Sequence, residues 1–116
     1  MRDYRKYKVW ELGHELTLEI YRVTLEFPAA EKFGIVSQMQ RAAYSIPSNI
    51  SEGCGRDSDK EFARYLVIAK GSASELEYFL LLSKDLKYLN EKDYDALFDI
   101  VNQVKRSLYN LINKIK

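Results

Sequence analysis

Cysteine and histidine each occur once among the 116 residues, as Cys54 and His14. A single cysteine excludes an internal disulfide framework and every zinc site built from several cysteines. Glu11 and His14 have the Glu-x-x-His spacing of di-iron bundles, but such a centre needs that motif twice. Cys54 has only His14 as a candidate base, and the two residues belong to different segments, which disfavours a catalytic thiol. We therefore expect no metal, no cofactor and no catalytic residue.

Long apolar runs and an excess of one charge are also missing. No segment approaches the ~18 apolar residues of a membrane-spanning helix, and the charged N-terminal segment has no apolar stretch behind it. We therefore expect neither a signal peptide nor a membrane contact, and a cytoplasmic protein. Lysine and arginine number 18 against 17 aspartates and glutamates. Any electrostatic attraction to a nucleic acid must therefore come from local clustering of charge.

Proline and glycine are scarce, at two and five residues, which is too few for the many turns of an all-β chain. Apolar residues make up 47% of the chain and recur every three or four positions, which places them along one side of an α-helix. Length and composition fit one domain spanning residues 1–116. The four series are Val9, Gly13, Leu16, Ile20, Val23, Phe27; Ile35, Met39, Ala42, Ile46, Ile50; Phe62, Leu66, Ala69, Ala73, Leu76, Leu80; and Tyr94, Leu97, Val101, Val104, Leu108, Leu111, Ile115.

The first two predicted helices have identifiable ends. The first spans residues 8–27 and stops before Pro28, because proline disfavours a helical conformation in the residue that precedes it. The second begins near Ala29 and passes Pro47 with a kink rather than a stop, since its apolar series continues beyond that residue. It ends at residues 53–55, where we expect a glycine in the left-handed conformation.

The third predicted helix opens with a capping box, in which the Ser58 hydroxyl accepts from the Glu61 amide, and it closes near residues 87–88. Asn90 caps the fourth, whose acidic first turns and basic last turns suit the helix dipole. Short connections between long helices favour antiparallel neighbours. The sequence therefore predicts an all-α fold, an up-down-up-down antiparallel four-helix bundle. In that register Gly71 faces small residues of the second helix, and we expect a close helix contact there.

The third and fourth predicted helices carry more apolar residues than one seam uses. A monomer seldom leaves a large apolar surface in water, and aromatic residues are favoured at interfaces. Self-association is the leading interpretation, and a core face wide enough to bury the surplus is the alternative. The candidate interface residues are Tyr65, Ile68, Phe79, Leu82, Leu86, Phe98, Tyr109 and Ile112.

Three basic stretches meet at one end of the predicted bundle: the N-terminal segment, the connection between the second and third helices, and the end of the fourth helix. The acidic residues within 91–99 lie at the other end. This polarity favours contact with nucleic-acid phosphates; the alternative is that the cations only complement the helix dipole and aid solubility. The candidate phosphate-contacting residues are Arg2, Arg5, Lys6, Arg56, Lys60, Arg64, Lys105, Arg106, Lys114 and Lys116.

Several short segments carry a resemblance to a known family. They are Trp10, Phe27-Pro28 with Glu31, Gln38 with Arg41-Ala42-Ala43, Ser45-Ile46-Pro47-Ser48-Asn49-Ile50 with Glu52-Gly53, and Ala69-Lys70-Gly71-Ser72-Ala73 with Glu75-Leu76. Across residues 10–89 the chain resembles the bacterial four-helix-bundle proteins encoded within intervening sequences of 23S ribosomal RNA genes. Those proteins are similar to the accessory variability protein of diversity-generating retroelements.

The resemblance implies a four-helix bundle that assembles as a ring-shaped homopentamer, with no known enzymatic activity and no catalytic residues to carry over. The retroelement relatives bind nucleic acid and a reverse transcriptase through a basic surface, and for the ribosomal relatives RNA association is inferred from gene location. The net charge of +1 is well below that of the strongly basic retroelement proteins. We therefore expect a homo-oligomeric bundle, pentameric, that contacts 23S rRNA through its basic end. The alternative is a scaffold that recruits a protein partner.

Overall fold

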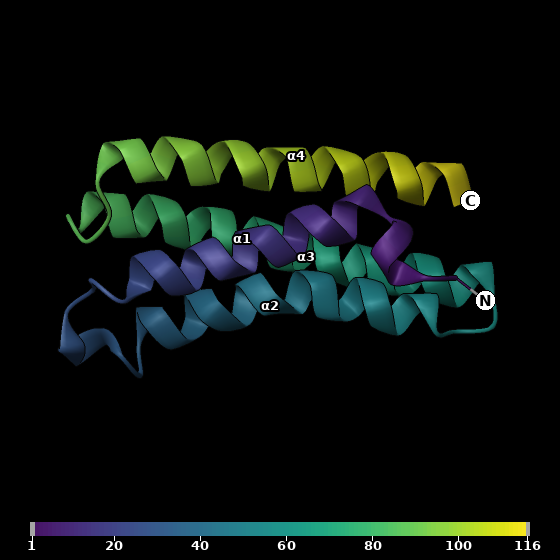
Figure 1. Ribbon diagram of the computed structural model, residues 1–116, viewed down its shortest axis with the longest axis horizontal. Coiled ribbons are helices and arrows are strands. Elements are labelled where there is room, and N and C mark those ends of the chain that lie inside the picture. Colours follow the sequence, from purple (N-terminus) through teal and green to yellow (C-terminus); the bar gives the residue numbers. More distant parts are fainter. Residues whose placement is uncertain (1, 116) are drawn as a thin grey trace.

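In the computed structural model, which describes residues 2–115, four long helices lie side by side (Figure 1). They are α1 (Lys8–Thr24), α2 (Ile35–Cys54), α3 (Asp59–Asp85) and α4 (Glu91–Ile115), with two short 3₁₀ turns, η1 (Tyr4–Lys6) and η2 (Ala29–Glu31). Each helix runs antiparallel to the next, and the molecule measures 43 × 23 × 19 Å. The predicted all-α, up-down-up-down antiparallel four-helix bundle is confirmed. No helix within residues 2–115 is long and apolar enough to cross a membrane.

The bundle core is formed by the predicted apolar seams. Every position of the first three series is buried, as are Leu97, Val101, Val104 and Leu108 of the fourth. Contacts join α1 to α2, α2 to α3, α3 to α4, and α4 back to α1, whereas the backbones of the diagonal pairs stay apart within the described residues. The outer faces of α1 and α3 therefore lie on opposite sides of the molecule.

The connection between α1 and α2 differs from the prediction. α1 ends at Thr24 rather than at residue 27, and the amide of Phe27 donates to the Thr24 carbonyl at 3.1 Å in a tightened last turn. The second helix was expected to begin near Ala29, which is wrong: a 3₁₀ turn occupies that position and α2 begins at Ile35. Gly34, with φ −107° and ψ −117°, interrupts the helical conformation between the two.

The α2 helix continues past Pro47, as predicted, and the kink expected at that residue stays a prediction. Pro47 has no N–H to donate to the Ala43 carbonyl. The Thr17 hydroxyl of α1 lies 3.1 Å from that carbonyl oxygen and 2.8 Å from the Gly13 carbonyl oxygen of its own helix. A Cβ added to Gly13 would lie only 2.9 Å from Ile46 Cγ2 and 3.4 Å from Pro47 Cδ, so α1 approaches α2 closely here because residue 13 has no side chain.

The helix ends also correct one expectation and confirm two others. Gly55 caps α2 with φ −83°, so the predicted left-handed glycine is absent there. Ser58 accepts from the Glu61 amide at 3.1 Å, and Asn90 accepts from the Asp93 amide at 2.7 Å, as predicted. The reciprocal bond of the capping box is not formed, because the Glu61 carboxylate accepts from Arg64 instead. The left-handed position lies instead after α3, where Lys87 has φ 67°.

Lys87→Gly is expected to raise the free energy of unfolding by about 0.5–1 kcal/mol. A left-handed conformation costs a residue with a Cβ roughly 1–2 kcal/mol, which glycine avoids, although glycine also increases the entropy of the unfolded chain. The surrounding turn stays in place, because the Lys87 and Tyr88 amides donate to the Lys84 and Ser83 carbonyls. Thermal unfolding would measure the change. Lys87→Ala is the control, and an equal gain from alanine would assign the effect to the lost charge rather than to the backbone.

Candidate functional site

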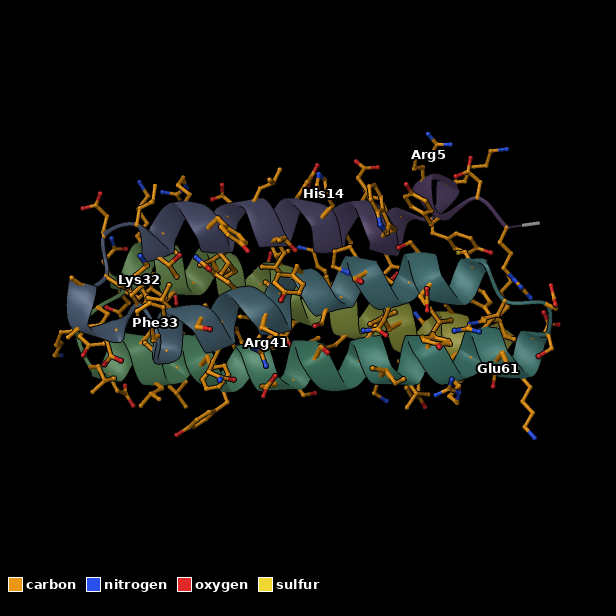
Figure 2. All side chains as sticks on the ribbon, turned by 90° about the horizontal axis from the view of Figure 1, so that it is seen from below. Arg5, His14, Lys32, Phe33, Arg41 and Glu61 are labelled. Atoms are coloured by element: carbon orange, nitrogen blue, oxygen red, sulfur yellow. The ribbon has the colours of Figure 1, made fainter. Side chains whose placement is uncertain are left out.

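The three basic stretches do meet at one end of the bundle. Figure 1 places the N-terminal segment, the connection between α2 and α3, and the end of α4 at the same end. Figure 2 shows Arg5 and Glu61 at that end, with Lys32 and Phe33 at the opposite end. Of the predicted cations, Lys116 lies outside the described residues.

The arginines of this end are paired with acidic residues. Arg2 forms an ion pair with Asp59 and stacks over the Phe62 ring, 4.3 Å from its centroid. The other pairs, with their N–O distances, are Arg5–Asp3 (3.2 Å), Arg56–Glu52 (3.1 Å) and Arg64–Glu61 (3.2 Å). The bond from Arg64 lowers the pKa of the Glu61 carboxyl, and the backbone and side-chain bonds from Arg5 lower the pKa of Asp3. These pairs reduce the positive field that the sequence alone predicts.

Three lysines of this end remain without an acidic partner within residues 2–115. They are Lys6 of the N-terminal segment, Lys60 of the first turn of α3 and Lys114 of the last turn of α4, and all three are exposed. We call these three residues the basic end. Their side chains are free to contact phosphates, whereas each arginine would first have to leave its carboxylate.

Lys105 and Arg106 do not belong to this end. They lie about ten residues before the end of α4, roughly 15 Å along the helix axis. The Lys105 ammonium is 3.1 Å from Glu77 of α3. Both residues instead line a shallow groove of about 470 Å³ between α3 and α4. Its lining, which we call the lateral groove, is Lys70, Asn102, Lys105, Arg106, Tyr109 and Asn110. Lys70 was missed, because only its tertiary position brings it beside α4.

The predicted oligomer interface divides into three groups. Ile112 is only 5% exposed and belongs to the core, which corrects its assignment. Tyr65 is half-buried beneath Arg56 and Arg64, and Phe79 and Leu82 pack against the core. A wide core face therefore accounts for part of the surplus of apolar residues on α3 and α4. The remaining members are exposed on α3, at its C-cap or on α4: Ile68, Leu86, Phe98 and Tyr109.

The outward side of α3 nevertheless carries several exposed apolar residues, which alternate with polar ones such as Ser74 and Glu75. Gly71 lies on this exposed side with no atom of the described chain within 4 Å of a Cβ built on it, so the predicted close contact with α2 is wrong. The small residues that do pack between α2 and α3 are the buried alanines, such as Ala42 and Ala69. We call the exposed apolar residues, together with this glycine, the α3 outer face: Val67, Ile68, Gly71, Tyr78, Leu81 and Leu86.

A second exposed apolar surface was missed. Leu18 and Tyr21 are exposed on α1, Leu25 follows at its C-cap, and Phe33, in the connection to α2, is 89% exposed. We call these four residues the α1 surface. The steps of three and four between the first three are a helical spacing outside the core seam, and that signal was available in the sequence.

The residues considered for catalysis have structural environments. Cys54 is buried, and burial raises the pKa of its thiol, which keeps it protonated. His14 is exposed on α1 (Figure 2) and stacks on Trp10, with ring centroids 5.1 Å apart. Among residues 2–115, no group of three or more histidine, cysteine, aspartate or glutamate side chains is placed to hold a metal ion.

Comparison with known proteins gives a family and a fold. The family model described as 23S rRNA-intervening sequence protein matches residues 5–110. The crystal structure of a protein with unknown function from the S23 ribosomal protein family, from Bacteroides thetaiotaomicron VPI-5482, superposes with a TM-score of 0.81 at 25% sequence identity. That match covers 90% of this chain and 97% of the other. No curated protein sequence matches this chain.

Proposed function

Because the chain belongs to the 23S rRNA-intervening sequence protein family, we propose that it is a self-associating bundle that contacts RNA phosphates through its basic end. It acts as a non-enzymatic, cytoplasmic binding protein, and the pentamer is its expected assembly. The observation that carries the RNA contact is the convergence of Lys6, Lys60 and Lys114, exposed and without acidic partners in the described chain, from three separate segments.

Self-association strengthens such a site. Three cations on one protomer give weak, sequence-independent attraction to phosphates. An assembly presents the same three cations several times, and binding at a second protomer then benefits from a high effective concentration. A ring of protomers would therefore bind RNA far more tightly than one protomer.

The two exposed apolar surfaces favour a ring over a two-fold dimer. A two-fold interface uses one surface against its own copy, whereas a cyclic interface joins two different surfaces of neighbouring protomers. The α1 surface and the α3 outer face lie on opposite sides, because α1 and α3 are diagonal in the bundle. A head-to-tail contact covers both, while an isologous dimer leaves one exposed to water.

RNA binding is tested by titrating a 23S rRNA fragment at several salt concentrations. Affinity is expected to fall by on the order of 10³ between about 50 and 200 mM salt if six or more phosphates are contacted across the assembly. Replacing the three lysines of the basic end by glutamine should reduce both the affinity and its salt dependence. Lys92→Gln, at an exposed cation of the opposite end, is the matched control. The proposal is contradicted if the affinity does not change with salt concentration, or if the triple variant binds as tightly as the wild-type protein.

The second candidate is a scaffold that recruits a protein partner. It is favoured by the pairing of Arg2, Arg5, Arg56 and Arg64 with acidic residues, which reduces the positive field around the basic end to that of its three lysines. An assembled protein that fails to bind RNA at low salt would replace the first function with this one. A single partner retained after nuclease treatment would then identify what the scaffold recruits.

A further inference from the structure

The lateral groove gathers three cations around an exposed aromatic ring. The Lys70 ammonium lies 5.3 Å from the centroid of the Tyr109 ring, and Tyr109 is 56% exposed. Lys105 and Arg106 of α4 line the same groove. The groove is lined by residues of α3 and α4, two helices that lie side by side (Figure 1).

The acidic residues around the groove leave it positive. Glu77 is the one carboxylate that an ion pair ties to the lining, through Lys105, and each of the two side chains is 28% exposed. Asp99, one turn before Asn102 on α4, accepts from Gln103 at 2.9 Å. Neither Lys70 nor Arg106 has an acidic partner within the part of the chain that the structure describes. Two uncompensated cations therefore flank the ring.

The fold does not require these side chains. Tyr109 and Arg106 are exposed on the outside of α4, whose buried positions are held by Val104 and Leu108. Asn102, which lines the groove, donates one side-chain hydrogen bond, to the Phe98 carbonyl at 3.0 Å, and its amide oxygen remains an acceptor. An exposed ring, flanking cations and side-chain amides form a set that can bind a ligand.

We propose that the lateral groove binds single-stranded nucleic acid, with Tyr109 stacking on one base and Lys70 and Arg106 contacting the flanking phosphates. Proteins that bind single strands combine a positive groove with aromatic side chains on which bases stack. Bases in a duplex are already stacked and do not reach such a ring. The inference rests on the proposed function, since it requires that the protein binds RNA. It adds a second binding site, which is specific for single strands, and names the residues that contact them.

The test separates stacking from charge in one set of variants. The probe is a fluorescent oligouridylate of about 12 nucleotides, with a duplex of equal length as the second probe. Tyr109→Leu is expected to lower affinity for the single strand about tenfold and to leave duplex binding and the salt dependence unchanged. Arg106→Gln should weaken both probes and reduce the salt slope by about one phosphate contact. Tyr109→Phe should retain wild-type affinity, because its ring still stacks.

Controls distinguish this groove from the basic end. Tyr44→Leu removes a comparably exposed ring, 46% exposed on α2, and should change neither probe. Light scattering of each variant shows whether assembly is intact, since Tyr109 was also a predicted interface residue. If the basic-end variant weakens binding while Tyr109→Leu does not, the groove proposal fails and the proposed function stands. If the wild-type protein binds neither probe, both fail. Polyglutamate can also be added as a competitor of the fluorescent oligouridylate. If it displaces that probe as well as an unlabelled oligouridylate of equal charge does, the groove is not a nucleic-acid site.

Discussion

If the chain self-associates as proposed, Gly71→Glu is expected to convert the oligomer into a monomer of 13.6 kDa. Gly71 lies in the middle of the α3 outer face, and the space around its Cβ position is open in the described protomer. Its backbone is helical, so glutamate fits without strain and improves helix propensity by roughly 0.5–1 kcal/mol. The protomer should therefore fold as well as the parent chain, while assembly would require an unpaired carboxylate to be buried against the next protomer. Light scattering at fixed protein concentration measures the change in mass.

The matched control for this charge is Ser48→Glu. Ser48 is exposed on α2 and belongs to neither of the two apolar surfaces, so the same added charge should leave the mass unchanged. A Gly71→Glu variant that keeps the wild-type mass would show that the α3 outer face is not an interface. A wild-type protein of 13.6 kDa would contradict self-association altogether and would leave the exposed apolar residues of α1 and α3 unexplained.

The core was predictable because burial of one helix face leaves a regular trace in the sequence. Leu16, Ile20 and Leu76 stand at steps of three or four in their series, and each is fully buried. The start of α2 was not predictable in this way, because the Ala29 region has the composition of a helix and only the conformation of Gly34 interrupts it. The prediction for Gly71 was wrong for a related reason. The register between two helices predicts the height of a residue along the helix axis, but not the side of the helix on which it lies.

The candidate site was only partly predictable. The meeting of the three basic stretches follows from helix order alone. The pairing of Arg2 with Asp59 depends on how the N-terminal segment folds against α3, which no local pattern reports. The placement of Lys70 beside Tyr109 likewise depends on the register between α3 and α4. Charge counted along the sequence therefore overstates the field at the basic end and misses the positive groove on the side of the bundle.

The crossing of α1 and α2 explains how a proline is accommodated inside a core helix. Pro47 leaves the Ala43 carbonyl without its usual helical donor, and an unsatisfied buried carbonyl costs about 1–3 kcal/mol. Thr17 lies within hydrogen-bond distance of that oxygen, at 3.1 Å, because Gly13 lets the two helices approach. The three residues thus depend on one another: the glycine lets the helices approach, and the threonine then supplies the hydrogen bond that the proline cannot donate.

A double-mutant cycle tests that unit. Thr17→Val keeps the shape of the side chain but removes its hydroxyl, and it is expected to lower the free energy of unfolding by about 1–3 kcal/mol. In a Pro47→Ala background, the new amide at residue 47 donates to the Ala43 carbonyl, so the same change should cost about 1 kcal/mol less. Urea unfolding of the four proteins measures the coupling. If the two changes are additive, the Thr17 hydroxyl donates only to the Gly13 carbonyl of its own helix, 2.8 Å away. In that case the proline is tolerated because its ring packs well, and not because Thr17 replaces the missing hydrogen bond.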